Sequence, residues 1–259
     1  MREELKIILG SNYGIDFFTS VDAYGEKLER EGILVFPKFI NEIGISHILN
    51  EAEKVKDQAY QSRSEYNVYV KPNDPNFNKD SARNRIMHTT KKCIPNDLIS
   101  NHSPLIQLYN SPLIRIFFAS LFKVPKLYPY SDPLSSININ YYGEGDALGW
   151  HFDNSDFTIT LLIKNCNQGG IYQYFTDMRY TDDGDENYQV VEDVLNGLRS
   201  PKTAYSNAGD LMLFKGNRSL HKVTEVEEGE RILVTLNYNI KSGVPLSKQS
   251  RLTFFGRSE

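Results

Sequence analysis

Sulfur and imidazole are scarce in this sequence. Only two of the 259 residues are cysteine, Cys93 and Cys166, and only five are histidine. Two cysteines are too few for a disulfide framework or a thiolate zinc site, and such scarcity is typical of a reducing, cytoplasmic compartment. We expect both thiols to be small buried side chains rather than nucleophiles. A metal site must draw on the five histidines, which are His47, His88, His102, His151 and His221.

Long apolar runs and an excess of positive charge are also missing. The run from Leu113 to Phe122 is interrupted by Arg115 and is shorter than the roughly 18–20 residues of a membrane helix. The first residues include Glu3 and Glu4, so we expect no signal peptide. The net charge of −4 supplies no positive field for nucleic acid. We therefore expect neither a membrane nor a nucleic acid as partner.

What the chain does contain suits one globular domain. Hydrophobic residues make up 40% and charged residues 24% of the sequence, which is enough to bury a core. A length of 259 residues fits one large domain better than two small ones. We expect a single domain over residues 1–259, with a mostly helical support in residues 1–124 and the core of the fold in residues 125–259.

The first part of the chain shows helical patterns around one early strand. Residues 32–36 are a short apolar strand, and residues 41–58 carry apolar side chains at helical spacing. Residues 59–84 are polar and contain two prolines, which predicts a long surface loop. The pairs Ser103-Pro104 and Ser111-Pro112 are each typical of a helix N-cap followed by proline, so two helices should begin there.

From residue 126 onward, short β-type runs alternate with turns rich in Gly, Asn and Asp. Residues 190–198 predict a helix among them, and the acidic residues 182–186 predict a solvated loop or a lid. Many short strands with turn signals indicate a mainly β fold, a barrel or double-sheet jelly roll buttressed by the N-terminal helices. The predicted strands are residues 126–130, 135–142, 157–163, 170–174, 210–215, 231–239 and 252–255.

Two of these strands separate polar from apolar side chains. Along residues 136–142, serine, asparagine and tyrosine occupy one face, and isoleucine and tyrosine occupy the other. Along residues 231–239, the alternate positions that begin with Arg231 and end with Asn239 are mostly polar. The pattern fits an ordinary sheet with one face in water. It also fits a barrel with a polar interior and helices on its outer face.

One short segment supplies two candidate metal ligands. His151 and Asp153 lie two residues apart, so in a strand their side chains point to the same side. His221 follows seventy residues later in another β-rich segment. Two imidazoles and one carboxylate on one face of an octahedral ion form the facial triad of non-haem Fe(II) oxygenases, which leaves room for a bidentate cosubstrate and dioxygen. The candidate metal ligands and catalytic centre are therefore His151, Asp153 and His221.

Arg231 supports this interpretation because it follows His221 by ten residues, on the next predicted strand. A dicarboxylate that chelates iron through its 2-oxo acid end needs a partner for its distal carboxylate, and a guanidinium supplies a bidentate one. The alternative is a surface ion pair between Arg231 and the acidic residues 225–230. The four positions together favour the metal site.

These residues and the order of the strands resemble the Fe(II)/2-oxoglutarate-dependent dioxygenases, which are built on a double-stranded β-helix. The closer likeness is to the branch of free amino-acid radical halogenases, such as the lysine chlorinase, and their sister hydroxylases. It runs from about residue 83 to the end, whereas residues 1–80 match only as a generic helical preface. The most specific stretches are residues 149–162, 169–174 with Arg179, 209–214, 219–224 and 251–256.

Within this branch, one position separates two activities. The halogenases have a small residue where Asp153 stands here, which leaves a coordination site for halide. Because the carboxylate is present, the resemblance implies a hydroxylase and not a halogenase. It also implies Fe(II) and 2-oxoglutarate as cofactors and dioxygen as a cosubstrate. Succinate and carbon dioxide would be released as an unactivated C–H bond is hydroxylated.

The resemblance and the strand faces together suggest contacts with the cosubstrate. Tyr142 and Thr160 are expected to join Arg231 in binding 2-oxoglutarate. Thr158 also alternates inward on the Thr160 strand, but Thr160 is the preferred candidate.

Candidate substrate contacts come from the same two sources. In the family, an arginine before the barrel holds the carboxylate of the amino acid, and Arg85 or Arg83 fits that role; either could equally be a solvated surface residue. Asparagines on the polar faces are further candidates, although asparagine is also common in turns at strand ends. These candidates are Asn138, Asn154, Asn237 and Asn239.

The predicted function is hydroxylation of a free polar amino acid, with lysine as the first candidate. One alternative is an oxygenase that acts on a protein side chain or a larger natural product. Another is a non-catalytic jelly-roll binding protein, or a cupin-like zinc protein, that keeps the ligands without the reaction. A free amino acid predicts an enclosed site, and a protein substrate predicts an open groove. The sequence makes no prediction about oligomeric state.

Overall fold

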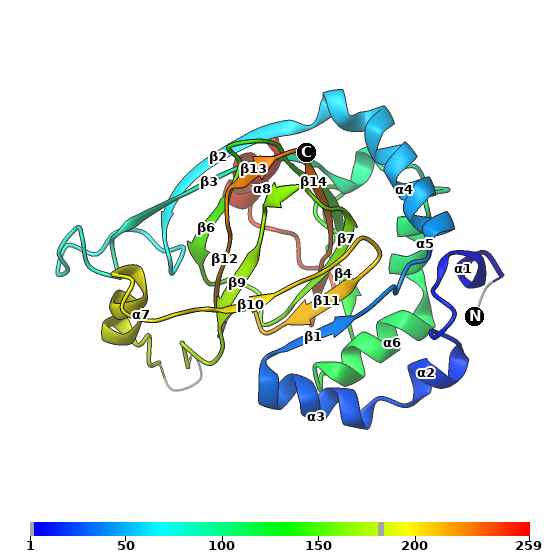
Figure 1. The fold of residues 1–259 in the computed structure, drawn as a ribbon, viewed down its shortest axis with the longest axis horizontal. Helices are drawn as coiled ribbons and strands as arrows, with labels where there is room; N and C mark the ends of the chain where they lie inside the picture. Colours follow the sequence, from blue (N-terminus) through cyan, green and yellow to red (C-terminus); the bar gives the residue numbers. More distant parts are fainter. Residues whose placement is uncertain (1–2, 181–183) are drawn as a thin grey trace.

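The computed structural model describes residues 3–180 and 184–259. Its main feature is an 11-stranded antiparallel sheet that curls so that its two halves face each other (Figure 1). The strands, in their order across the sheet, are β1 (Ile33–Phe36), β11 (Leu211–Phe214), β7 (Thr158–Lys164), β14 (Arg231–Leu236), β5 (Ile137–Tyr142), β3 (Ile86–Ile94), β6 (Leu148–His151), β12 (Leu220–Val223), β9 (Tyr172–Phe175) and β10 (Lys202–Ala204), with β2 (Tyr60–Asn67) paired to β3.

Strand β3 connects the two halves of this sheet. Its first part pairs with β6 and its last part pairs with β5. The halves meet through side chains such as Tyr172 of β9 and Phe214 of β11, whose ring centroids are 5.3 Å apart. Two small sheets close loops at the edges: β8 (Gln168–Gly169) with β13 (Val226–Glu228), and β4 (Tyr128–Pro129) with β15 (Tyr238–Asn239). The mainly β, jelly-roll fold predicted from the sequence is confirmed.

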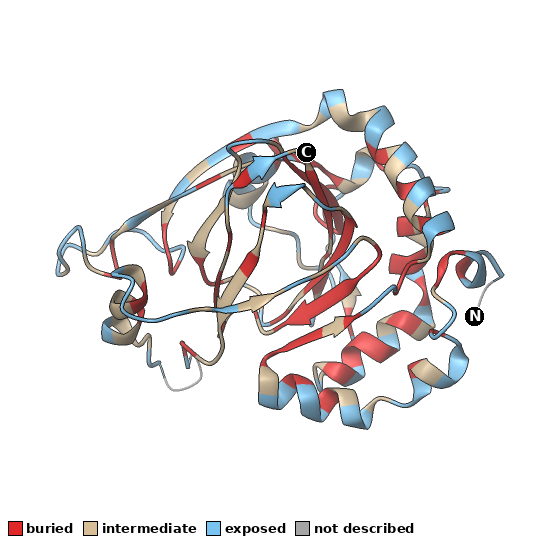
Figure 2. Cartoon of the chain, viewed as in Figure 1, coloured by how far each residue is buried: buried red, intermediate tan, exposed pale blue. Residues whose placement is uncertain are grey.

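Six N-terminal helices cover the outer face of the half that contains β11, β7, β14 and β5 (Figure 1). Apolar side chains of that face, such as Ile159 and Val234, share one buried core with Phe117 and Phe118 of the helical layer. Figure 2 shows this contact as buried residues on both layers. The helices are α1 (Glu3–Ile8), α2 (Ile15–Thr19), α3 (Asp22–Glu31), α4 (Glu42–Val55), α5 (Pro104–Asn110) and α6 (Pro112–Leu121).

Helices α5 and α6 begin as the two Ser-Pro pairs predict. The hydroxyl oxygen of Ser103 accepts a hydrogen bond from the amide of Leu105, and that of Ser111 accepts one from the amide of Ile114. The proline at the first helical position lacks a donor that would have no intrahelical partner there. Local chemistry thus fixes where the helical layer starts against the sheet.

The opposite face of the strands points into the barrel and is polar. Arg231 is paired with Tyr142 across β14 and β5, and Thr235 is paired with Asn138. The residues between them, such as Ile232, face the helices. Of the two arrangements that the alternation allowed, the structure has the barrel with a polar inner face.

Two sequence expectations need correction. Residues 252–255 belong to a helix, α8 (Lys248–Phe255), and not to a strand; Ser247 caps it by accepting from the amide of Ser250. Residues 60–67 form β2 and lie within the predicted loop 59–84, because both faces of this edge strand are largely polar and gave no apolar signal. The first 124 residues therefore supply three strands in addition to their helices.

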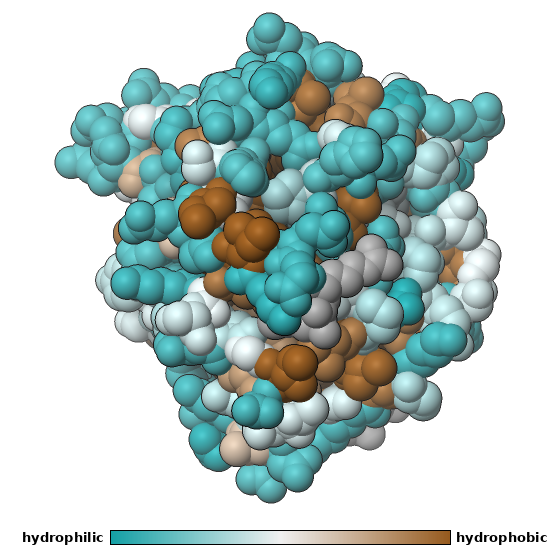
Figure 3. All heavy atoms as spheres, turned by 90° about the vertical axis from the view of Figure 1, so that its right-hand side faces the viewer, coloured by the Kyte–Doolittle hydropathy of each residue, from teal (hydrophilic) through white to brown (hydrophobic). Residues whose placement is uncertain are grey.

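Other expectations concern single elements and the surface. The predicted helix at 190–198 is α7 (Tyr188–Leu195), whereas residues 182 and 183 of the acidic segment lie outside the described residues. No helix within the described ranges is long and apolar enough to cross a bilayer. The side of the molecule seen in Figure 3 is mainly hydrophilic with small separate apolar patches. Cys93 is buried, Cys166 is half-buried, and both are free thiols.

Candidate metal centre

Strands β6 and β12 place two imidazoles side by side on the inner face of the barrel. His151 and His221 are directly paired residues, and their ring centroids are 4.2 Å apart. In each ring Nδ1 lies 2.8 Å from the backbone carbonyl two residues earlier, that of Gly149 and of Ser219. A protonated Nδ1 donates to such a carbonyl and leaves Nε2 unprotonated, as a metal ligand requires.

Asp153 brings a carboxylate to the same point. It follows the end of β6, where its amide donates to the carbonyl of Gly216 at 3.0 Å. Its Oδ1 lies 3.3 Å from Nε2 of His151 and 3.7 Å from Nε2 of His221. Its Oδ2 accepts a hydrogen bond from the hydroxyl of Thr158. One carboxylate oxygen is thus held by the protein, and the other faces both imidazoles.

The protonation states suit a cation. Burial, and then repulsion by His151, lower the pKa of His221 to about 4, so its imidazole is neutral near pH 7. Burial opposes the ionisation of Asp153, but the attraction of His221 and the hydrogen bond with His151 prevail and hold the Asp153 pKa well below its usual range. Two imidazoles and one carboxylate are the donor set that prefers Fe(II) with open positions.

The spacing of the donor atoms fits one ion. The three ligand atoms all lie within 4.8 Å of one another. Ligands on adjacent positions of an ion, at bond lengths of about 2.1 Å, are about 3 Å apart. The triad is also accessible, because 23% of the Asp153 side chain is exposed. The other three histidines, His47, His88 and His102, are exposed on the surface.

Gly216 makes room for this carboxylate, and its substitution tests the geometry. A Cβ atom at Gly216 would overlap Oδ2 of Asp153 and lie 2.7 Å from the Thr158 hydroxyl. We expect Gly216→Ala to displace Asp153 and weaken Fe(II) binding about 10- to 100-fold, as disturbing the support of a metal ligand usually does. Metal titration measures this. Gly14→Ala is the control, because nothing lies within 4 Å of a Cβ there; unchanged affinity in Gly216→Ala would contradict the arrangement.

Arg231 lies inside the same barrel, and no carboxylate of the described residues pairs with it. Its side chain is 3% exposed, and its guanidinium carbon lies 5.7 Å from the centre of the Tyr142 ring. One terminal nitrogen, Nη1, is buried without a hydrogen-bond partner. Burial lowers the pKa of Arg231, and the nearby Tyr142 opposes this effect. A buried cation that lacks a counter-charge is costly unless an anion binds to it.

The alternative for Arg231, a surface pair with residues 225–230, is not what the structure shows. Glu230 forms ion pairs with Lys56 at 2.5 Å and with Lys164 at 3.3 Å. Arg231 points inward instead, and within residues 3–180 and 184–259 no ion pair involves it. With no acidic partner among the described residues, Arg231 suits an anionic ligand.

The two threonines of β7 both face inward but differ in their partners. Thr158 is paired with Phe214 and Thr160 with Met212, both of which belong to the inner core of the barrel. Thr158 contacts Asp153, whereas the hydroxyl of Thr160 lies 3.5 Å from the carbonyl of Met212. The structure therefore brings Thr158, the second choice from the sequence, to the triad. Thr160 stays a candidate for the cosubstrate.

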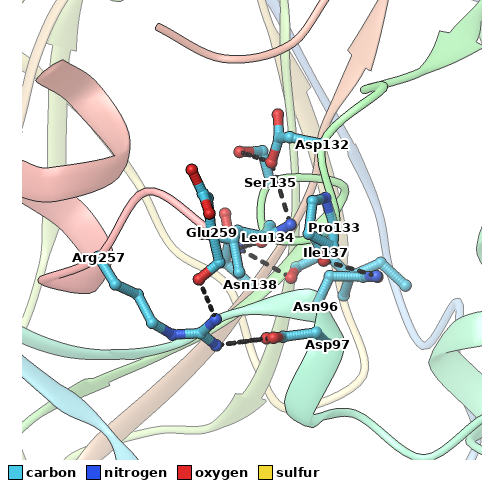
Figure 4. A network of polar contacts seen from close by, with 10 residues as sticks. All are labelled: Asn96, Asp97, Asp132, Pro133, Leu134, Ser135, Ile137, Asn138, Arg257 and Glu259. Atoms are coloured by element: carbon cyan, nitrogen blue, oxygen red, sulfur yellow. Dashed lines mark hydrogen bonds and ion pairs between the residues drawn. The ribbon is translucent and has the colours of Figure 1, made fainter. Parts of the chain in front are cut away.

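Three of the four asparagines predicted to contact substrate form hydrogen bonds within the protein. Asn138 donates to the carbonyls of Leu134 and Ile137, which Figure 4 shows, and its oxygen accepts from Asn237 at 2.9 Å. Asn239 accepts from the amide of Lys241. Asn154 is exposed next to the triad carboxylate. The alternation correctly gave the inner face of Asn138, but it could not show that these amides bond to neighbours.

The two candidate arginines lie in the loop that leads into β3. Arg85 donates to the carbonyl of Asp80 and to the side chain of Asn196 in the turn after α7. Arg83 is buried, donates to the carbonyl of Pro72, and has one terminal nitrogen without a partner. The structure thus ties Arg85 to surface loops, and its contact with substrate stays a prediction.

Two tyrosines near the triad were missed by the sequence reasoning. The Tyr66 ring of β2 lies 5.9 Å from the His151 ring, and its hydroxyl contacts Thr89. Burial raises the Tyr66 pKa, and nearby Tyr142 and Asp153 raise it further. The Tyr172 hydroxyl is buried without a hydrogen-bond partner, and burial and Asp153 raise its pKa. Tyr66 therefore lies beside the metal centre.

A double-stranded β-helix with two imidazoles and one carboxylate converging on its inner face is the architecture of the Fe(II)/2-oxoglutarate oxygenases. The family model described as Halogenase D matches residues 19–251, and the chain belongs to this family. The resemblance inferred from the sequence is thereby confirmed. No curated protein matches the chain.

Solved structures agree on the fold. The carbocyclase SnoK from nogalamycin biosynthesis aligns with a TM-score of 0.61 and 15% identity over 93% of this chain and 94% of its own. HygX from Streptomyces hygroscopicus, with nickel and 2-oxoglutarate bound, aligns with a TM-score of 0.55 and 13% identity over 87% and 89%. A 2OG-Fe(II) oxygenase family oxidoreductase from Burkholderia pseudomallei has a TM-score of 0.53 and 13% identity over 91% and 95%. At these identities the likeness concerns the fold.

Proposed function

We propose that this protein is an Fe(II)- and 2-oxoglutarate-dependent hydroxylase of a free polar amino acid, with lysine as the first candidate. The observation that carries the proposal is the convergence of His151, Asp153 and His221 on the inner face that also holds the unpaired Arg231. A metal site alone fits many proteins. A metal site with a buried cation on the facing half of the barrel fits a metal-chelating dicarboxylate.

Some residues of the site would position the metal ligands, and others would orient the cosubstrate. The Nδ1 contacts to Gly149 and Ser219 fix the two imidazole rings, and Thr158 fixes the carboxylate. Arg231 would pair with the distal carboxylate of 2-oxoglutarate, with Tyr142 beside it and Thr160 on the same inner face. Fe(II), 2-oxoglutarate and dioxygen supply the oxidation of the C–H bond, with succinate and carbon dioxide as coproducts.

Asp153 supports a hydroxylase within a family that is named for halogenation. The Asp153 oxygen that faces both imidazoles occupies the position that a halide would need. A halogenase must leave this position open for chloride. The ligand set of this chain therefore favours transfer of oxygen.

A free amino acid is favoured over a protein side chain by family membership, although the fold serves several outcomes. Similar structures include the epimerase SnoN and a prolyl hydroxylase in complex with a peptide from Trichoplax adhaerens.

The free thiols Cys93 and Cys166 support action in a reducing compartment such as the cytoplasm.

The experiment is a panel of free amino acids with the purified protein, Fe(II), 2-oxoglutarate and air. We expect one polar amino acid, lysine first, to stimulate succinate formation and to gain the mass of one oxygen. Mass spectrometry of both products measures this, and reactions without 2-oxoglutarate are the control. If no amino acid stimulates succinate formation, the proposal is wrong. A chlorinated product in the presence of chloride would contradict the role given to Asp153.

A further inference from the structure

A lysine side chain enters the barrel at the joint between the two halves of the sheet. On β3, Thr89 pairs with Leu148 of β6, and Lys92 pairs with Tyr141 of β5. Lys91 lies between these two registers and next to the point where β3 changes partner. It therefore stands between the strand of the candidate metal ligand His151 and the strands of the candidate cosubstrate site.

The Lys91 ammonium group is turned toward the inner face and has only neutral partners. It donates to Oδ1 of Asn140 at 2.8 Å, and Asn140 is 1% exposed on the inner face of β5. It also lies 5.7 Å from the centre of the Phe254 ring of α8. Among the described residues, no carboxylate forms an ion pair with Lys91. Asn140 holds the cation in place without neutralising it.

A second cation approaches from α8. Arg251 precedes Phe254 by three residues, so both side chains lie on the same side of this helix. The Nε atom of Arg251 is buried and has no hydrogen-bond partner. Helix α8 packs on β2 and β3, where Ser62, paired with Lys91, donates to the carbonyl of Thr253. Lys91 of β3 and Arg251 of α8 thus belong to two elements that pack against each other, and neither is paired with a carboxylate among the described residues.

The distance from this contact to the metal ligands suits a small molecule. Thr89 contacts Tyr66, whose ring lies 5.9 Å from that of His151. Thr89 and Lys91 share a face of β3 and are about 7 Å apart along the strand. A molecule bound at one end to Lys91 can therefore extend past Tyr66 toward the triad. Such a span matches an amino acid side chain and not a bulky natural product.

We propose that Lys91, held by Asn140, binds the carboxylate of the substrate, and that Arg251 of the helix packed on β3 assists it. This inference rests on the proposed function and adds the group by which the free amino acid is recognised. Arg231 is separated from Lys91 by β5 and remains the partner of 2-oxoglutarate. A residue inside a protein chain has no free α-carboxylate, because that group is part of a peptide bond. Such a substrate would leave both cations without this partner.

The test compares acids with their amides in wild-type and variant proteins. We expect the hydroxylated amino acid to bind the anaerobic protein loaded with Fe(II) and 2-oxoglutarate at least 10-fold more tightly than its α-amide. Lys91→Met should weaken binding of the acid about 10- to 100-fold, the range for a charge-assisted hydrogen bond, and should leave amide binding nearly unchanged. Arg251→Met should act in the same direction, and Lys91→Arg should retain most of the affinity.

Lys92→Met is the matched control, because it changes the next residue of β3, which points to the opposite face. Thermal unfolding shows whether each variant folds. If Lys91→Met binds the acid as tightly as the wild type does, the inference is overturned. A loss of affinity that is equal for the acid and the amide also overturns it. A weaker affinity for 2-oxoglutarate in Lys91→Met would also overturn it. If the wild type binds and hydroxylates no amino acid, the proposed function itself fails, which is a different result.

Discussion

Replacing Arg231 with methionine is expected to raise the Kd of 2-oxoglutarate by a factor of about 30 or more. The reason is that Arg231 is buried, has no acidic partner in the part of the chain that the structure describes, and has an Nη1 without a hydrogen-bond partner, so the ligand carboxylate would be its counter-charge. Removing one partner of such a buried charge pair costs about 2–5 kcal/mol. Calorimetric titration of 2-oxoglutarate into the Mn(II)-loaded protein measures the effect without turnover.

The same substitution should leave the ligand-free protein at least as stable as the wild type. An unpaired buried guanidinium is a cost to the folded state, and methionine fills similar space without a charge. Metal affinity should change little, because Arg231 belongs to β14. The candidate ligands lie elsewhere, at the end of β6, just after it, and on β12. The control is Arg63→Met on the exposed side of β2. Unchanged 2-oxoglutarate affinity would remove Arg231 from the site.

Replacing Asp153 with alanine is expected to abolish hydroxylation and weaken Fe(II) binding at least about 100-fold. Loss of a ligand should exceed the 10- to 100-fold effect of disturbing its support. The two imidazoles would also lose the carboxylate that lies 3.3 Å and 3.7 Å from them. Anaerobic Fe(II) titration measures the affinity, and succinate formation measures the activity.

Asp156→Ala provides the matched control for that variant. Asp156 lies three residues later, is exposed, and bonds only to the side chain of Asn217 among the described interactions. Its loss should leave both iron affinity and turnover within about two-fold of the wild type. If Asp153→Ala kept the iron affinity of Asp156→Ala, Asp153 would not be a ligand.

Some of this site follows from the sequence because coordination chemistry restricts residue types. Two imidazoles and a carboxylate at His151, Asp153 and His221, with Arg231 on the next strand, left few other interpretations. The alternation along β5 and β14 also gave the correct inner face for Asn138 and Tyr142. Such periodicity shows which side of a sheet a residue occupies, because neighbouring side chains must alternate.

Periodicity does not show which partner a polar side chain finds. Asn138 and Asn237 form a hydrogen bond with each other across β5 and the end of β14, and their contact with substrate stays a prediction. Strand β2 was not predicted because both of its faces are largely polar. For that reason Tyr66 was not a candidate site residue. The candidate role of Lys91 could not be predicted from the sequence either, because it depends on β3 pairing with both halves of the sheet. These contacts arise only from tertiary structure.

Central to the proposed function is that Fe(II) and 2-oxoglutarate bind together between the triad and Arg231. Anaerobic titration of the apo-protein with both, followed by the visible charge-transfer absorption of a chelated Fe(II)–2-oxo acid complex, tests it most directly. We predict that the band appears only when both are present and saturates at one of each per chain. Absence of the band, or a band that Asp153→Ala and Arg231→Met leave unchanged, would contradict the claim.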